Sequence, residues 1–297
     1  MGGVTTPGLA AAVAREGALG MIAAGGLPAD VVVGQVGAAI DTAGAGTRVG
    51  ASFLMPFFDE RAIDAVSGIA ALVECFYGDP DARVVRRIHD GGALAAWQVG
   101  TDVEARAAVD AGCDVVVVQG REAGGHVRGT VPLLQLLDRV RGRTDVPLVA
   151  AGGIGTGTAM AAALLAGADA VRVGTRFVAT SEADVHPSYG AALIAAGSDD
   201  TVLTEAFSMG WPHAPHRVLR RCVEASALDP ALRSPVPPTR AFDGDVAAAA
   251  LYAGESVGDV TAVLPAAAVV RELVRDADAV MRRTRPGRPA PPRRPSG

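Results

Sequence analysis

Short runs of β-branched and other apolar residues alternate with alanine-rich segments along most of the chain. Continuous apolar runs are typical of strands buried on both faces, and the longer segments have the apolar spacing of helices. The alternation therefore predicts repeated βα units around a parallel sheet. The predicted strands are Gly20–Ala23, Arg48–Phe53, Ala71–Phe76, Leu94–Val99, Asp114–Gln119, Pro147–Ala151 and Ala170–Val173. The predicted helices are Pro7–Glu16, Ala29–Thr42, Glu60–Val66, Asp81–Asp90, Val103–Ala111, Val131–Arg141 and Gly157–Ala166.

Capping residues support these helix boundaries. Thr6 precedes Pro7 and Thr101 precedes Asp102, and at such helix starts a hydroxyl can accept a hydrogen bond from a free N–H of the first turn. Gly112 and Gly167 each follow a helix directly, as in a left-handed C-terminal cap.

The predicted strands are one too few for a closed barrel of eight βα units. The first recognisable element is the helix that begins at Pro7, so a preceding strand has no room after Met1. We expect a (β/α)8 TIM-type barrel that lacks its first strand: either Met1 is not the true start, or the barrel is incomplete. An open, doubly wound sheet is the alternative.

The βα alternation stops near Glu182, where proline clusters and two or three expected helices begin. We interpret this region as a helical lid inserted after the last strand. Further helices are predicted at Val246–Tyr252 and Ala266–Arg283, packed on the barrel. The expected division is a barrel at 1–181, the lid at 182–245, the C-terminal helices at 246–284 and a disordered Arg/Pro-rich tail at 285–297.

Composition excludes several classes of protein. The net charge of −5 argues against a nucleic-acid partner, and no apolar run reaches the ~18 residues that a membrane span needs. The N-terminus lacks a signal-peptide pattern, so we expect a cytoplasmic protein. The chain contains no lysine, which excludes Schiff-base enzymes and lysine-containing phosphate loops. The three cysteines are Cys75, Cys113 and Cys222, and they lack metal-binding spacing. We therefore expect buried free thiols and no bound metal.

Candidate chemistry lies just after a run of valines, in the loop Gln119–Gly129. His126 stands there beside Gly124 and Gly125, at the carboxyl edge of the sheet where parallel α/β proteins place their sites. Histidine exchanges protons near neutral pH, and glycines allow a flat ligand close to the backbone. A glycine-rich surface turn with a solvated histidine is the alternative.

A second pattern follows the last two strands. Gly152-Gly153 comes after one strand and Gly174-Thr175 after the next. Loops at these positions of a barrel commonly bind phosphate through free N–H groups. Glycine-rich turns that bind no ligand are the alternative reading of each loop.

These motifs together resemble the nitronate monooxygenase family, formerly called 2-nitropropane dioxygenases. The resemblance implies an FMN-dependent barrel that oxidises alkyl nitronates or nitroalkanes with O2 to a carbonyl compound and nitrite. It rests on Gly2–Pro7, Gln119–Gly129, Ala151–Ile154, Val173–Phe177 and Tyr252–Gly258.

The resemblance also implies roles for single residues. His126 would be catalytic, either as a base toward a neutral nitroalkane or, once protonated, as the group that holds the anionic nitronate. Ser52 stands where the family has an asparagine that contacts the flavin, and Glu255 stands in place of a glutamine. The expected cofactor-binding residues are Gln119, Gly125, Gly152, Gly153, Gly174, Thr175 and, with a shorter side chain than usual, Ser52.

Three alternatives stay open from the sequence. One is the related FMN-dependent enoyl-acyl carrier protein reductase, which has a similar glycine-histidine loop. The missing strand motivates a second alternative, a flavin-binding protein without turnover. The third is a flavin-free barrel that acts on a sugar phosphate. The physiological substrate and the oligomeric state, with a homodimer as one option, are left open.

Overall fold

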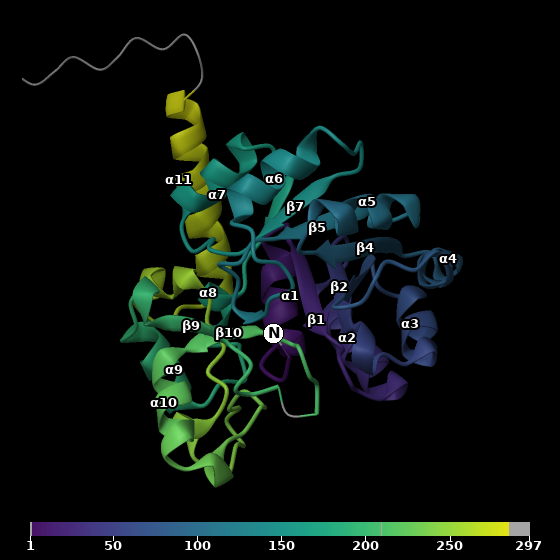
Figure 1. Cartoon of the computed structure of the whole chain (residues 1–297). Helices are drawn as coiled ribbons and strands as arrows, with labels where there is room; N and C mark the ends of the chain where they lie inside the picture. Colours follow the sequence, from purple (N-terminus) through teal and green to yellow (C-terminus); the bar gives the residue numbers. More distant parts are fainter. Residues whose placement is uncertain (1, 209, 285–297) are drawn as a thin grey trace, which may run out of the picture.

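A curled parallel sheet occupies the centre of the computed structural model, which describes residues 2–208 and 210–284. Its strands are hydrogen-bonded in chain order, and helices surround its outer face (Figure 1). All the predicted strands of the barrel are confirmed. They are β1 (Leu19–Ala23), β2 (Arg48–Leu54), β3 (Leu72–Phe76), β4 (Leu94–Val99), β5 (Val115–Gln119), β7 (Leu148–Ala151) and β8 (Ala170–Arg172).

The predicted barrel helices are confirmed as well. The Thr6 hydroxyl accepts a hydrogen bond from the N–H of Leu9 at 3.0 Å, so the expected cap forms. Gly112 and Gly167 have φ values of 93° and 107°, the left-handed conformation that ends a helix. The helices are α1 (Pro7–Arg15), α2 (Ala29–Ala43), α3 (Glu60–Ser67), α4 (Ala82–Gly91), α5 (Asp102–Asp110), α6 (Leu133–Arg141) and α7 (Gly157–Leu165).

The strand order separates the two fold alternatives. A doubly wound sheet reverses its strand order at a switch point, whereas this order runs β1-β2-β3-β4-β5-β7-β8 without reversal. Strands β1 and β8 stand at its two ends, and among the described residues no strand pairing joins them. The fold is therefore the expected (β/α)8-type barrel wall with one strand fewer, open between β8 and β1.

A second, antiparallel sheet was missed by the sequence analysis. It has the order β6-β10-β9 and lies beside the barrel, with the helices that follow β8 (Figure 1). It is made of β6 (Gly125–His126), β9 (Thr201–Thr204) and β10 (His216–Leu219). The neighbouring helices are α8 (Thr175–Val178), α9 (Pro187–Ile194) and α10 (Arg220–Leu228). Short 3-10 helices also occur along the chain, at Met55–Phe57, Ser198–Asp200, Pro230–Leu232, Val246–Ala248 and Glu255–Asp259.

The predicted helix at Val246–Tyr252 is wrong. Only Val246–Ala248 forms a 3-10 turn, and the chain then becomes extended. The N–H of Ala250 donates to the Ser234 carbonyl, and Tyr252 forms a bridge with Val218. Tertiary pairing of this buried segment outweighs the helix propensity of its alanines.

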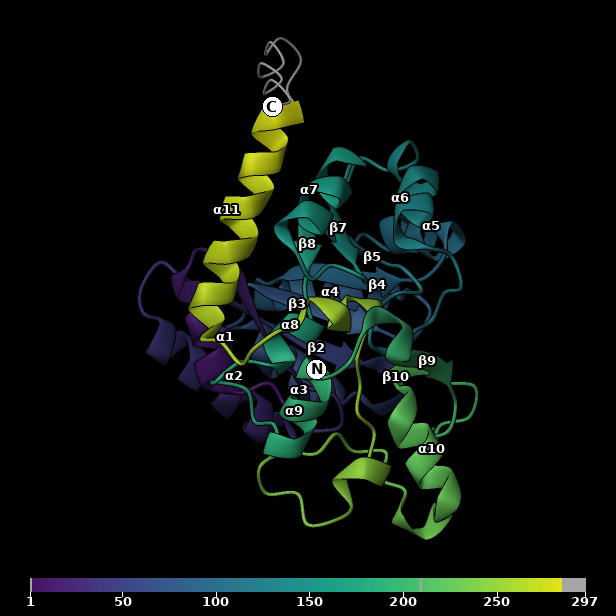
Figure 2. The same cartoon turned by 90° about the vertical axis from the view of Figure 1, so that its left-hand side faces the viewer.

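The long C-terminal helix α11 (Ala266–Thr284) confirms the other prediction in this region. It runs beside α7 in both views (Figures 1 and 2). The predicted disorder of 285–297 lies outside the described residues. No described helix is long and apolar enough to cross a membrane.

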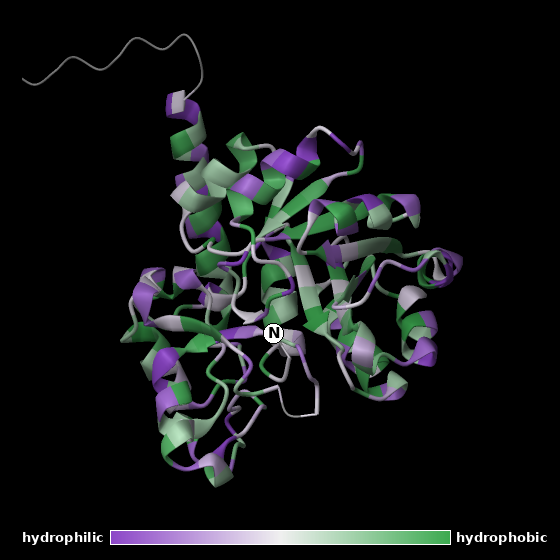
Figure 3. Cartoon of the chain, viewed as in Figure 1, coloured by the Kyte–Doolittle hydropathy of each residue, from purple (hydrophilic) through white to green (hydrophobic). Residues whose placement is uncertain are grey.

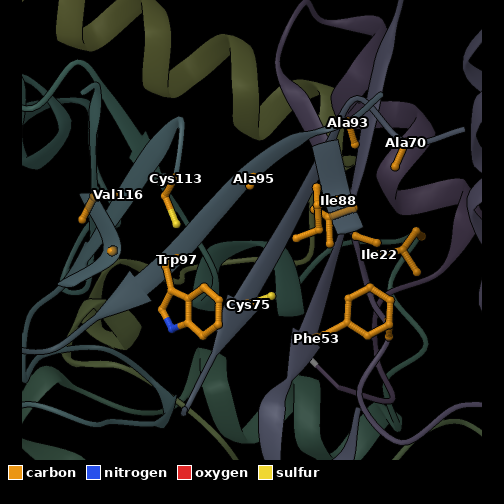
Figure 4. Packing of buried hydrophobic residues seen from close by; sticks show 14 of the residues in the cluster. Ile22, Phe53, Ala70, Cys75, Ile88, Ala93, Ala95, Trp97, Cys113 and Val116 are labelled. Carbon is orange, nitrogen blue, oxygen red and sulfur yellow. The ribbon is translucent and has the colours of Figure 1, made fainter. Parts of the chain in front are cut away.

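The main core lies between the sheet and its outer helices. The strands are predominantly hydrophobic (Figure 3), and Phe53 and Trp97 gather on the helix-facing side (Figure 4). The cysteines are free and buried, as expected, and burial raises the pKa of each thiol: to about 12 in Cys113, to about 11 in Cys222, and well above its usual value in Cys75.

Candidate functional site

Alternation along the strands places polar side chains inside the barrel. Val73 and Cys75 of β3 face the outer helices, so Glu74 between them faces inward. By the same alternation Gln98 of β4 and Gln119 of β5 face inward, beside small residues. The inner wall of the sheet therefore carries polar side chains, although the sequence analysis treated these strands as continuous apolar runs.

A cavity of about 480 Å³ opens at this end of the sheet. Its volume is in the range of small-molecule and cofactor sites. Every site residue expected from the sequence lines it, which brings together residues from β2 to α8. These residues are Ser52, Gln119, Gly125, His126, Gly152, Gly153, Gly174 and Thr175.

His126 is held in a short strand rather than in a free turn. Strand β6 pairs with β10, and His126 lies opposite His216 in the register. The N–H of Val127 continues the pairing by donating to the Pro215 carbonyl at 2.9 Å. The loop after β5 is thus fixed by a segment about ninety residues later in the chain.

Gln119 fixes the same loop from the barrel side. Its Nε2 donates to the carbonyl of His126 at 2.9 Å, and its Oε1 accepts from the N–H of Arg128 at 3.2 Å. Arg128 in turn donates to Glu104 and to Asp79, each at 2.6 Å. Gln119 therefore positions the backbone of His126 as well as lining the cavity.

Aromatic rings pack around His126. The Trp211 ring stacks on the imidazole with centroids 4.4 Å apart, and Tyr77 packs edge-on against Trp211 at 4.6 Å. Tyr77 and His213 both have left-handed backbone, with φ of 66° and 57°, and the Tyr77 hydroxyl donates to the His213 carbonyl. Such conformations persist only where neighbouring contacts enforce them.

This environment makes His126 a neutral imidazole at physiological pH. Burial lowers the pKa of His126 to about 4, and His216 adds a smaller effect in the same direction. Neither ring nitrogen of His126 has a hydrogen bond to another described residue. Because the unfolded chain binds more protons between pH 4 and 6.5, this residue lowers the stability of the fold as pH falls through that window.

Two hydrogen bonds fix the ring of His216. Its Nδ1 lies 2.9 Å from the Ala214 carbonyl and must donate there, while its Nε2 accepts from the N–H of Phe207 at 3.2 Å. These two partners select a single neutral tautomer. Burial also lowers the pKa of His216.

The glycine-rich loops have the backbone that a phosphate site needs. Gly152 and Gly153 adopt φ of 115° and 67°, which side chains rarely allow. The N–H groups of Gly152, Gly153 and Gly174 donate no hydrogen bond to another described residue. A side chain at Gly174 would meet no protein atom within 4 Å, so the space beside it belongs to the cavity. The residues therefore fit a phosphate-bearing cofactor.

Thr175 and Glu255 have partners that the sequence did not indicate. The Thr175 hydroxyl accepts a hydrogen bond from the N–H of Gly254 at 3.0 Å and can still donate its proton. Glu255 forms an ion pair with Arg217 at 3.2 Å and does not line the cavity, where Gly254 and Ser256 do. The extra negative charge at position 255 is thus paired and directed away from the site.

Three polar residues of the cavity were missed: Glu74, Gln98 and Arg172. The sequence carried a signal for them, because each of the three is a polar residue at an inward position of an otherwise apolar strand. Counting alternate positions along each strand would have found them.

Comparison with known proteins identifies the family of this fold and site. The family model described as nitronate monooxygenase matches residues 41–276, well over half of the chain. The chain belongs to the nitronate monooxygenase family. Several curated relatives from fungi and bacteria are named nitronate monooxygenase or probable nitronate monooxygenase. The prediction of an oxidoreductase of this family is thereby confirmed.

Two curated relatives are named for a different reaction. The (3aS,4S,5R,7aS)-5-hydroxy-7a-methyl-1-oxo-octahydro-1H-indene-4-carboxyl-CoA dehydrogenase of Mycobacterium tuberculosis is 34% identical over 232 residues, 74% of this chain and 61% of that protein. The matched region spans only 58% to 61% of the length of the first curated relatives.

Two solved structures are similar over nearly their whole length. FabK from Thermotoga maritima has a TM-score of 0.82 at 29% identity, covering 95% of this chain and 92% of that chain. Nitroalkane oxidase from Streptomyces ansochromogenes has a TM-score of 0.80 at 30% identity, covering 95% and 94%. Both support the barrel fold.

Replacing Trp211 with alanine should raise the pKa of His126 from about 4 toward its ordinary value of 6.5, because burial is the main cause of the shift. Nitrogen-15 NMR of the imidazole over a pH titration measures this. Phe57→Leu is the control, since Phe57 packs on Trp211 but has no ring contact with His126. If the pKa of His126 is unchanged in the Trp211 variant, groups other than Trp211 cause its burial.

Proposed function

We propose that this protein is an FMN-dependent enzyme that oxidises alkyl nitronates or nitroalkanes with O2, giving a carbonyl compound and nitrite. The observation that carries the proposal is the gathering of His126 and the expected cofactor-binding residues around one cavity. Membership of the nitronate monooxygenase family supports it. The similarity to a nitroalkane oxidase over 95% of the chain supports it further.

The glycine loops would hold the cofactor. In this proposal the N–H groups of Gly152, Gly153 and Gly174, with the Thr175 hydroxyl, bind the FMN phosphate, while Gln119, Gly125 and Ser52 line the flavin. FMN, when bound, would accept electrons from the substrate and pass them to O2.

His126 would act in its neutral form. A neutral imidazole can take the proton on the carbon next to a nitro group, or donate its N–H to an oxygen of a nitronate. The low pKa of His126 disfavours the other expected role, in which a protonated imidazole holds the anion at neutral pH. The weak basicity favours the nitronate, which needs no deprotonation, over the neutral nitroalkane.

The region after β8 would cover the substrate. Tyr189 and Pro235–Pro237 of this region line the cavity, together with Tyr252 and Gly2–Val4. We propose that 182–245 is the lid of the site, that 1–181 binds the flavin, and that 246–284 packs against the barrel. The largely apolar lid side suits a substrate with a hydrocarbon part.

The purified protein should have the visible absorbance of a flavin, either as isolated or after addition of FMN. It should then consume O2 when an alkyl nitronate is added without a nicotinamide. A protein that stays colourless in excess FMN would contradict the proposal. If NAD(P)H is consumed with an enoyl thioester while nitronate drives no O2 uptake, a reductase or dehydrogenase activity replaces the oxidase.

Gly174→Ala should weaken FMN binding about tenfold or more without changing stability. Gly174 has φ of −114°, which alanine tolerates, and the added methyl meets only the cavity. Fluorescence titration gives the Kd, and urea unfolding should stay within about 0.5 kcal/mol. Gly34→Ala in the exposed face of α2 is the control. An unchanged Kd would remove Gly174 from the cofactor site.

His126→Ala should leave FMN binding intact while turnover of a neutral nitroalkane falls by about 10²-fold or more, as expected when a general base is lost. Turnover with preformed nitronate should fall less. The matched control is His213→Asn, which replaces an exposed histidine with a residue that tolerates its left-handed backbone. Equal turnover in the His126 variant and the wild type would exclude this residue from the mechanism.

A further inference from the structure

One arginine crosses the inside of the barrel. Arg172 stands on β8, the last strand of the sheet, and its Nη1 donates to Glu74 on β3 and to Gln98 on β4. These partners precede it by 98 and 74 residues. The curl of the sheet brings the strands within reach, and the three side chains form a polar bridge between opposite walls.

The bridge forms part of the cavity wall. Glu74 and Gln98 are almost fully buried, at 3% and 5% exposure, whereas the Arg172 side chain is 28% exposed. The Nε and Nη2 groups of Arg172 donate no hydrogen bond to another described residue. Since Arg172 lines the cavity, these donors are available to what the cavity binds.

Charge in the cavity is confined to this pair. Among the described residues that line the cavity, Arg172 is the only arginine and Glu74 the only residue with a carboxylate. His126 adds no charge, since it is neutral at physiological pH. Arg172 belongs to the parallel sheet, two residues before Gly174, while His126 belongs to the antiparallel sheet. The cation is therefore on the side of the glycine loops.

We propose that Arg172 sets the reduction potential of the flavin, with Glu74 as the counter-ion that limits its effect. The inference rests on the proposed function. A flavin becomes more negative when it accepts electrons from the substrate, and a nearby fixed cation stabilises that form. The cation is fixed because a guanidinium does not lose its proton.

Charge variants of the pair test the inference in opposite directions. Glu74→Gln keeps an oxygen for Arg172 but removes the negative charge, so reduction should become about tenfold more favourable, or about 30 mV for a two-electron couple. Arg172→Met should make reduction less favourable by at least the same factor. Equilibration of the FMN-bound protein with a reference dye measures both.

A double variant covers the case in which Arg172→Met leaves Glu74 buried without a partner and prevents folding. Glu74→Gln combined with Arg172→Met removes both charges, and its potential should lie about 30 mV or more below that of Glu74→Gln alone. The matched controls are Glu16→Gln and Arg271→Met, a surface ion pair outside the cavity, which should leave the potential unchanged.

The outcomes separate the two proposals. Wild-type protein that binds no FMN would overturn the proposed function and this inference with it. Wild-type protein that binds FMN and oxidises nitronate, while the Glu74 and Arg172 variants keep the wild-type potential, would overturn the inference alone. Potentials that shift in the stated directions, with unchanged controls, support it.

Discussion

The structure depends on the two-sided alternation of its parallel strands. One set of side chains packs against the outer helices and is apolar, from Ala51 and Ala95 to Phe53 and Trp97. The other set faces the inside of the curl, where Ala96, Val117 and Ala151 leave space. Because that inner face is not needed for the main core, polar residues can occupy it near the carboxyl ends, and a cavity results.

Buried charges in and around this cavity are compensated in pairs. Glu74 meets Arg172 inside the barrel, and Glu255 meets Arg217 behind the loop that carries Gly254. A buried charge without a partner would be strongly destabilising. With the charges paired and His126 neutral, the polarity of the site comes mainly from backbone N–H groups and amide side chains.

Local patterns were enough to predict the barrel elements, because apolar runs, threonine caps and C-terminal glycines each act within a few residues. The expected site residues were brought together for the same reason, since parallel strands end at one edge. The pairing of β6 with β10 could not be predicted, as a strand of two residues has no periodicity and its partner is distant in sequence. The alanines of Ala247–Ala250 suggested a helix, but buried contacts with Ser234 decided their conformation.

The burial of the cysteines bears on the resistance of the protein to oxidation. In the proposed function the protein would work beside O2, and thiolates are the form of cysteine that oxidants attack. Cys75, Cys113 and Cys222 lie in the core with raised pKa values, so all three stay protonated and shielded. In the proposed function, burial would therefore keep these thiols away from the oxidant.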